Sequence, residues 1–226
     1  HIEALTKLVK EKELDCGFAF DGDADRCIAI DENGNVIDGD YVLYICGRYF
    51  KKHGRLDGNH VVATVMSNLG FFKAMEVNEI EVDVTKVGDK YVNEDMVRNG
   101  YVLGGEQSGH IIFSKHATTG DGILTAIMLM EVIMEEKSSL GLLAAGMKKY
   151  PQLLKNVEVT DKEAVMTNEE VLAERDAIDA ELGGDGRLLL RESGTEPVIR
   201  VMVEAETDEL CEKYVGRMVN TIRQNL

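Results

Sequence analysis

Three aspartates occupy alternate positions in the segment Asp21–Arg26, which lies between two apolar stretches. A looped backbone can gather carboxylates at i, i+2 and i+4 around one cation, and oxygen ligands alone suit Mg²⁺ or Ca²⁺ better than zinc. Without a cation, the three negative charges would repel one another. We therefore predict that Asp21, Asp23 and Asp25 bind a hard divalent metal, with a solvated acidic turn as the alternative.

Two other metal-site patterns fit this segment less well. An EF-hand loop would have glycine at its sixth position, where this chain has Arg26, and would lie between helices rather than strands. A phosphatase of the haloacid dehalogenase type also places Asp-x-Asp after an apolar strand, but a third Asp followed by Arg is foreign to that pattern. A strand-end loop that binds Mg²⁺ remains the favoured interpretation.

A second, glycine-rich segment covers residues 104–110 and combines a carboxylate, an amide, a hydroxyl and an imidazole. These groups are the ones needed to hold sugar hydroxyls and to move a proton. The alternative is a turn between strands in which His110 is a structural residue.

A third segment, Arg191–Pro197 with Arg200 just beyond it, places guanidinium groups beside hydroxyls and a glycine. Arginine offers a planar fork to phosphate oxygens, and glycine lets backbone N–H groups approach them. The chain has 25 Lys and Arg residues against 41 Asp and Glu residues, a net charge of −16, so an anion site must concentrate its few cations. That charge also argues against nucleic acid as a partner. An ordinary polar hairpin with a surface salt bridge is the alternative.

The elements that position these segments alternate between strand and helix up to about residue 150. The patterns predict strands over 16–20, 27–30, 60–66, 81–87 and 101–103, and helices over 2–13, 41–50, 69–77, 91–98 and 121–137. Helix 121–137 is apolar on nearly all sides, so we expect it to be buried. The Asn33-Gly34 pair predicts a hairpin turn with positive φ at both residues. The alternation favours a layered, largely parallel sheet.

After Pro151 the order changes to a strand over 157–159, a helix over 169–182, strands over 187–190 and 198–204, and a helix over 208–223. We therefore predict an α/β domain, a layered mixed sheet with helices on both faces, followed by a smaller α+β domain, with a boundary near Tyr150. No apolar stretch of the sequence is long enough for a membrane helix, and we expect no signal peptide because the first residues are polar and carry lysines. The four cysteines form no C-x-x-C pair, which favours buried free thiols in a reducing cytosol.

The three loops resemble the metal-binding, sugar-binding and phosphate-binding loops of the α-D-phosphohexomutases, in the same order and approximate spacing. Further segments resemble the branch of that family that acts on glucosamine phosphates: Val65–Gly70, Lys86–Val92, Thr118–Gly122 and Ser193–Glu204. The resemblance covers essentially the whole chain. It implies that residues 1–37 are the end of a second domain, residues 38–150 a third domain, and residues 151–226 a phosphate-binding fourth domain.

The resemblance also implies an activity, the interconversion of glucosamine 6-phosphate and glucosamine 1-phosphate. A phosphoserine would pass its phosphoryl group to the phosphorylated hexosamine, giving a hexose bisphosphate, and would take back the other phosphate. Mg²⁺ on the three aspartates would polarise the phosphoserine oxygens. The resemblance implies that Arg26 stabilises charge beside this centre and that Gly105, Glu106 and Ser108 bind the sugar. It implies that the phosphate is bound by Arg191, Ser193, Gly194, Thr195 and Arg200. His110 or Lys90 would transfer the proton, although Lys90 has the alternative of a solvated lysine at a helix start.

One departure from the family pattern concerns the phosphoserine itself. In the family it lies in a Thr-Ala-Ser-His-Asn-Pro loop, and none of the six serines here is followed by His-Asn-Pro. We therefore expect the chain to be the C-terminal half of a cytoplasmic enzyme, to need the missing N-terminal domains, and to be inactive alone. A sibling mutase for mannose or glucose phosphates, or a non-catalytic metal- and phosphosugar-binding module, are the alternatives.

Overall fold

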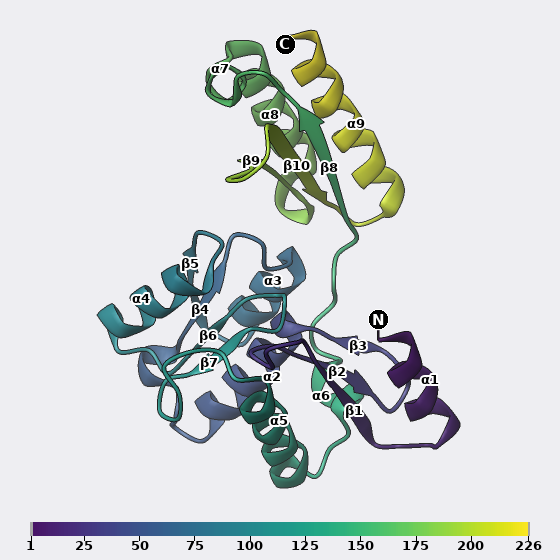
Figure 1. Cartoon of the computed structure of the whole chain (residues 1–226), viewed down its shortest axis with the longest axis vertical. Coiled ribbons are helices and arrows are strands. Elements are labelled where there is room, and N and C mark those ends of the chain that lie inside the picture. Colours follow the sequence, from purple (N-terminus) through teal and green to yellow (C-terminus); the bar gives the residue numbers. More distant parts are fainter. Residues whose placement is uncertain (1, 226) are drawn as a thin grey trace. The chain divides into compact units, whose positions relative to one another are not determined.

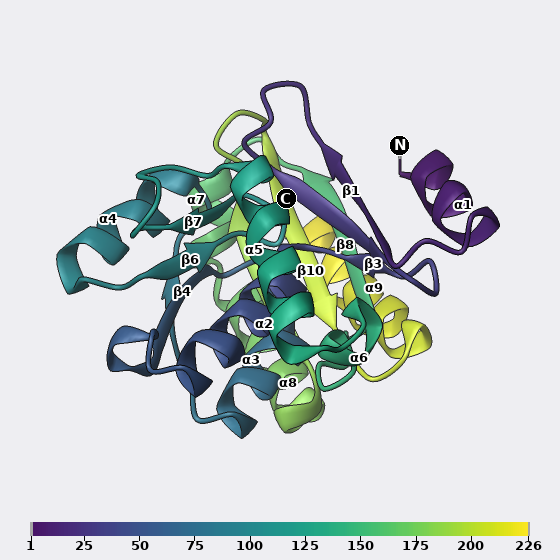
Figure 2. The ribbon, with the colours of Figure 1, turned by 90° about the horizontal axis from the view of Figure 1, so that it is seen from below.

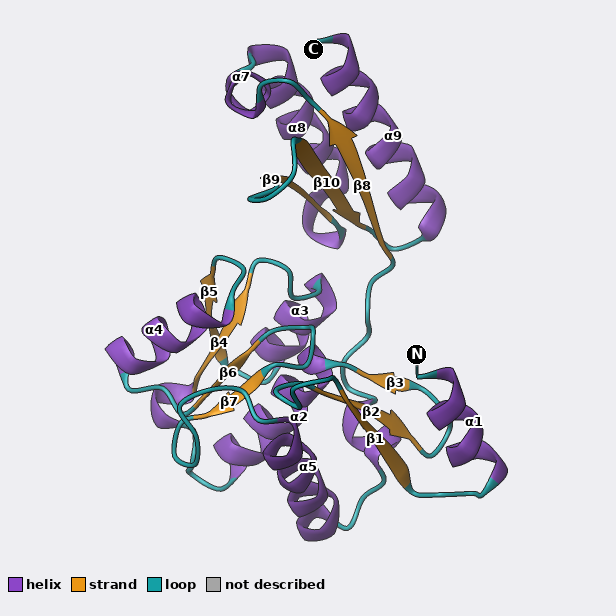
Figure 3. Ribbon diagram, viewed as in Figure 1, coloured by secondary structure: helices purple, strands orange, loops and turns teal. Residues whose placement is uncertain are grey.

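The computed structural model describes residues 2–225, which form two compact units divided between Lys148 and Lys149 (Figures 1 and 3). Each unit has its own hydrophobic core and is described by itself. None of the helices within residues 2–225 combines the length and the apolar character that a bilayer crossing needs.

The first unit begins with a small antiparallel sheet in the order β1-β2-β3, preceded by a helix. Its elements are α1 (Glu3–Glu11), β1 (Cys16–Phe20), β2 (Cys27–Asp31) and β3 (Val36–Ile37). The acidic loop joins β1 to β2, which pair antiparallel from Cys16 opposite Asp31 to Phe20 opposite Cys27. The two strands therefore hold both ends of the loop together.

The turn between β2 and β3 differs from the predicted one. Gly34 has a positive φ of 86°, but Asn33 does not. The Asp31 carboxylate accepts hydrogen bonds from the backbone N–H groups of Asn33 (2.9 Å) and Asn35 (2.7 Å). The prediction of two left-handed residues was wrong because this side-chain bonding closes a longer turn that needs only one.

A second sheet of the first unit has the order β5-β4-β6-β7, in which β5, β4 and β6 are parallel and β7 is antiparallel to β6. Its strands are β4 (His60–Thr64), β5 (Glu81–Thr85), β6 (Leu103–Gly105) and β7 (Ile111–Phe113). The helices are α2 (Gly39–Lys52), α3 (Leu69–Val77), α4 (Asp89–Asn99), α5 (Gly122–Glu136) and α6 (Leu140–Ala144), with a 3₁₀ turn, η1 (Asp57–Asn59). This arrangement confirms the predicted mixed α/β sheet.

Helices cover both faces of this second sheet (Figures 1 and 2). Along β4, Val61 and Ala63 belong to the main core with α2 and α3. Val62 points the other way and packs with Val92 and Met96 of α4. This alternation is the period of two that a strand imposes on its side chains.

Helix α5 is not buried on all sides, so that prediction was wrong. Met128, Leu129 and Val132 are 3% exposed or less, but a stripe along the opposite side is 38–69% exposed: Ile123, Ile127, Met130 and Met134. Its main contacts, with α2, β1 and β2, cover only one side of the helix. We refer to these four residues as the α5 stripe.

The cysteines are all free, as expected, but they are not equally buried. Cys27, Cys46 and Cys211 are buried, while Cys16 is half-buried. Burial raises the pKa of the Cys27 and Cys46 thiols to about 12, so both are inert thiols in the core.

The second unit is an antiparallel sheet in the order β8-β10-β9 with helices on one face. Its elements are β8 (Gln152–Glu158), α7 (Lys162–Thr167), α8 (Glu169–Leu182), η2 (Gly183–Asp185), β9 (Arg187–Glu192), β10 (Val198–Glu204) and α9 (Asp208–Gln224). Ile199, Val201 and Val203 of β10 pack against α8 and α9 in one core. Arg200, at an intervening position, therefore lies on the opposite face of the sheet.

Candidate functional site

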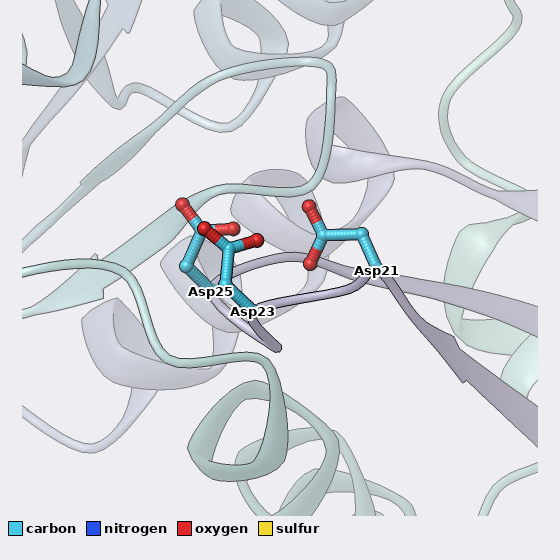
Figure 4. Close-up of side chains that lie close together, drawn as sticks. All are labelled: Asp21, Asp23 and Asp25. Carbon is cyan, nitrogen blue, oxygen red and sulfur yellow. The ribbon is translucent and has the colours of Figure 1, made fainter.

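The carboxylates of Asp21, Asp23 and Asp25 converge in the β1–β2 loop (Figure 4). One oxygen from each lies within 4.8 Å of the others, with Asp21 and Asp23 exposed and Asp25 half-buried. Ala24 adopts a positive φ of 58°, and its carbonyl accepts a hydrogen bond from the N–H of Gly122 (2.8 Å). This left-handed residue turns the chain so that alternate carboxylates gather on one side.

Little positive charge balances these three aspartates. Arg26 reaches only Asp21, at 3.9 Å between Nε and Oδ2. The pKa of Asp25 is raised mainly by partial burial and, to a smaller extent, by the negative charges of Asp23 and Asp21. The arrangement stores repulsion that a bound cation would relieve.

His110 lies directly behind Asp25. The His110 ring is 2% exposed, and its Nε2 lies 3.6 Å from an Asp25 carboxylate oxygen. The Gly120 N–H donates a hydrogen bond to the same Nε2 (3.2 Å). A Cβ on Gly120 would lie 2.4 Å from the ring, so glycine is required there.

Backbone contacts join the acidic loop to the glycine-rich loop. Arg26 and His110 form an antiparallel bridge, and the Cys27 N–H donates to the Gly109 carbonyl (3.1 Å). Gly109 has a φ of 94°, and a Cβ there would lie 2.4 Å from the Cys27 carbonyl oxygen. The structure thus brings the predicted metal-binding and sugar-binding loops side by side within the first unit.

Within the glycine-rich loop, Glu106 is oriented by a backbone donor. Its Oε1 accepts a hydrogen bond from the Gly88 N–H (2.9 Å), while Ser108 is exposed. Lys90 lies two residues beyond Gly88, but its side chain is 74% exposed and its Nζ lies 3.7 Å from Glu94. The lysine is therefore near the loop along the chain without being held by it.

The first residue of α2, Gly39, packs against the backbone of the same loop. Gly39 donates its N–H to the Gln107 carbonyl (3.0 Å), and a Cβ on Gly39 would lie 1.9 Å from the Glu106 carbonyl oxygen. Sequence reasoning missed this role of Gly39. The only signal was a glycine directly after Asp38, which caps α2 by accepting from the Tyr41 N–H (3.4 Å).

The third loop, in the second unit, closes on itself around Ser193. This residue is 2% exposed, and its hydroxyl accepts from the Glu196 N–H and from Arg200 Nη2, both at 3.3 Å. Arg200 Nη2 also donates to Glu196 Oε2 (3.1 Å). The Ser193 hydroxyl thus points into the loop, while Gly194 and Thr195 are exposed at its tip.

Two arginines lie side by side beneath this loop, because Arg191 is paired directly opposite Arg200 in the sheet. The pKa of Arg191 is lowered mainly by burial and, to a smaller extent, by the positive charge of Arg200. A third cation, Lys162 of α7, donates to the Ser193 carbonyl (2.7 Å). No local pattern predicts this role of Lys162, which lies 31 residues from its partner. Three cations, one of them paired with Glu196, surround the exposed Gly194 and Thr195, and together they can bind an anion.

Models of the phosphoglucomutase/phosphomannomutase family match most of the chain. Alpha/beta/alpha domain II matches residues 1–34, alpha/beta/alpha domain III matches residues 38–150, and the C-terminal domain matches residues 154–221.

Curated relatives named phosphoglucosamine mutase share more than half of their matched residues with this chain. The relative from Bacillus licheniformis is 57% identical over 226 residues, covering 100% of this chain and 50% of the relative. The one from Lachnospira eligens is 58% identical over 223 residues, covering 99% of this chain and 50% of the relative. The chain therefore spans about half the length of the curated relatives it matches.

Solved structures with the same fold are more distant in sequence. N-acetylphosphoglucosamine mutase of Aspergillus fumigatus, in complex with GlcNAc-6P and magnesium, has a TM-score of 0.77 at 22% identity, covering 92% of this chain and 48% of that one. A phosphoglucomutase/phosphomannomutase family protein from Burkholderia thailandensis has a TM-score of 0.76 at 20% identity, covering 99% of this chain and 50% of that one.

Proposed function

The chain belongs to the phosphoglucomutase/phosphomannomutase family, and from this we propose that it forms part of a phosphoglucosamine mutase. The reaction is the interconversion of glucosamine 6-phosphate and glucosamine 1-phosphate through a hexose bisphosphate. Identity of 57% to a phosphoglucosamine mutase along the whole chain favours this substrate over mannose or glucose phosphates.

We propose that this chain contributes three parts of such an enzyme but not its phosphoserine. Residues 1–37, 38–150 and 151–226 correspond to the end of a second domain, a third domain and a fourth domain. None of the six serines is followed by His-Asn-Pro, and Ser108 and Ser193 lie in the loops proposed to bind sugar and phosphate. The chain by itself is therefore expected to have no mutase activity, and its partner is the amino-terminal half that the relatives carry.

Asp21, Asp23 and Asp25 are the proposed ligands of one Mg²⁺. The support is their geometry, three carboxylate oxygens within 4.8 Å, together with the raised pKa of Asp25. The Aspergillus relative was solved with magnesium. Bound Mg²⁺ supplies charge neutralisation for phosphoryl transfer. Arg26 lies beside the carboxylates, where it adds a positive charge for the same purpose.

The neighbouring loop is the proposed sugar site. With Oε1 of Glu106 held by Gly88, its second oxygen is left to accept a sugar hydroxyl, and Ser108 offers an exposed hydroxyl in the same loop. Gly105 is buried at the end of β6, so it would contribute by letting the loop pack closely rather than by direct exposure. His110, at 2% exposed, is better placed to position Asp25 than to reach a substrate. Lys90, which is exposed, then becomes the preferred candidate for proton transfer.

The loop of the second unit is the proposed phosphate site. Arg191 supplies the planar fork, and the exposed Gly194 and Thr195 supply a backbone N–H and a hydroxyl. Arg200 is held by Ser193 and Glu196 and adds its charge from the neighbouring strand. Ser193 therefore acts by orienting Arg200 rather than as an outward-pointing ligand.

The observation that carries the proposal is the joining of the three-aspartate loop to the glycine-rich loop in one unit. The test is a fusion of the amino-terminal half of the Bacillus licheniformis relative to this chain, assayed with glucosamine, mannose and glucose 6-phosphates. We expect turnover of glucosamine 6-phosphate, its loss in Asp23→Asn, and none from the chain alone. A preference for mannose or glucose phosphate, or turnover by the chain alone, would contradict the proposal.

A further inference from the structure

A cavity of about 320 Å³ lies at the far end of α2 in the first unit. Its apolar floor is formed by Ile45 and Tyr49 of α2, Ile80, Val132 of α5, and Leu143 of α6. The volume falls within the range of small-molecule sites, roughly 300–1,000 Å³. Since α2 has 14 residues, it spans roughly 20 Å, and the glycine-rich loop contacts its opposite end at Gly39.

The rim of this cavity is unusually basic for this chain. Arg48, Lys51 and Lys52 line it, against one carboxylate, Glu136. Residues 41–56 include no Asp or Glu, although the chain has 41 of these among 226 residues. The positive charge is therefore concentrated at the one wall that α2 provides.

Two of these cations already have partners. Lys51 Nζ donates to the carbonyls of Asn78 (2.7 Å) and Glu79 (2.8 Å), which lie at the end of α3. Lys52 Nζ lies 2.6 Å from a Glu136 carboxylate oxygen. Both lysines are therefore used mainly to hold the walls of the cavity together.

Arg48 is held in place without being neutralised. Its Nη1 donates to the Tyr44 hydroxyl (3.1 Å), and its guanidinium carbon lies 5.1 Å from the centre of the Tyr44 ring. In the part of the chain that the structure describes, no carboxylate forms an ion pair with Arg48. A neutral hydroxyl orients the guanidinium and leaves its charge for a ligand.

We propose that this cavity binds an amphipathic monoanion, a small molecule with a compact apolar body and one carboxylate, sulfonate or phosphate group. The anionic group pairs with Arg48, and the apolar body rests on the floor formed by Tyr49, Ile80 and Val132. Sugar phosphates lack such an apolar body, so this ligand is of a different class from the proposed substrate. The site is independent of the proposed function.

The probe for this proposal is 8-anilino-1-naphthalenesulfonate, an aromatic sulfonate whose fluorescence rises on burial. We expect saturable binding of one molecule per chain, weakened about tenfold or more in Arg48→Gln. Arg98→Gln is the matched control, since Arg98 is a 72% exposed arginine on α4. The uncharged analogue N-phenyl-1-naphthylamine should bind wild type and Arg48→Gln equally.

A second variant separates this cavity from the other apolar surface of the unit, the α5 stripe. Ile127→Gln removes a 59% exposed apolar side chain from the stripe without changing the charge, and it should leave probe affinity unchanged. Thermal melting of each variant confirms that it is folded. The proposal is overturned by equal affinity of Arg48→Gln and wild type, by absence of saturable binding, or by loss of binding in Ile127→Gln alone.

Discussion

The acidic loop of the first unit and the basic loop of the second unit carry opposite charges but share one feature. Each places like charges side by side: Asp21, Asp23 and Asp25 in one, Arg191 and Arg200 in the other. In both loops the affected pKa moves toward the neutral form, upward for Asp25 and downward for Arg191. Each group is only partly neutralised, Asp21 by Arg26 and Arg200 by Glu196, and such a group of like charges favours the binding of an ion of opposite charge.

The two loops differ in how they are held. The acidic loop is fixed from outside, by His110 and by the backbone of the glycine-rich loop. The basic loop is fixed mainly from inside, by the hydrogen bonds of Ser193 with Glu196 and Arg200. The first site should therefore be sensitive to distant changes in its unit, and the second chiefly to changes within the loop.

Gly39→Ala should break the first site from outside. The new Cβ would lie 1.9 Å from the Glu106 carbonyl oxygen, so the glycine-rich loop must move or the helix must shift. We expect a loss of about 3 kcal/mol in the free energy of unfolding, measured by thermal or denaturant melting. Gly22→Ala, where an added Cβ meets nothing within 4 Å, is the control. Equal melting of the two variants would mean that the contact does not hold the loop.

Asp23→Asn should remove Mg²⁺ binding by the chain. Residues that merely support a metal ligand are worth about 10–100-fold in affinity, so losing a charged ligand should cost about 100-fold or more. Titration calorimetry with Mg²⁺ measures this loss. Asp15→Asn, at an exposed aspartate beyond the other end of β1, changes the net charge equally and should have little effect. Unchanged affinity in Asp23→Asn would remove the proposed site.

Arg191→Ala should weaken binding of glucosamine 6-phosphate or inorganic phosphate by about ten- to a hundredfold, since a charge-assisted bond contributes roughly 1.5–3 kcal/mol. Arg191→Lys should retain only part of the wild-type binding affinity, because an ammonium group cannot make the bidentate contact. Ligand titration and thermal melting on the same proteins measure both effects. Arg175→Ala, which removes a half-buried arginine that pairs with Asp176 on α8, is the control. Normal binding with a lowered melting temperature would make Arg191 structural.

Asp25→Asn should change the melting temperature least of the four variants, and the direction of that change should depend on whether Mg²⁺ is present. Without the metal, removing one of three repelling charges should raise the melting temperature slightly at pH 7. With saturating Mg²⁺ the order should reverse, because ligand binding stabilises wild type more than the variant. Melting curves with Mg²⁺ and with EDTA measure both states. A lower melting temperature for Asp25→Asn in EDTA would show that His110 already compensates the carboxylate.

Local patterns in the sequence were enough to predict most elements and all three loops. Helices α3 and α8 lie at the predicted residues because Asn68 and Asn168 cap their first turns. The loops could be found because their residue types and spacing lie within a few consecutive positions. Short elements such as β7, α6 and α7 escaped, since three to six residues carry too little periodicity.

Other features of the molecule depend on contacts between residues far apart along the chain, and only the tertiary structure decided them. The exposure of the α5 stripe, the hydrogen bond from Gly39 to Gln107 and the contact of Lys162 with Ser193 each depend on segments that no local pattern relates. The packing of His110 against Gly120 also became visible only there. The sequence by itself determined which groups can do chemistry, because residue type sets charge and hydrogen bonding. The fold decided which of them meet, because a side chain's surroundings depend on how the chain packs.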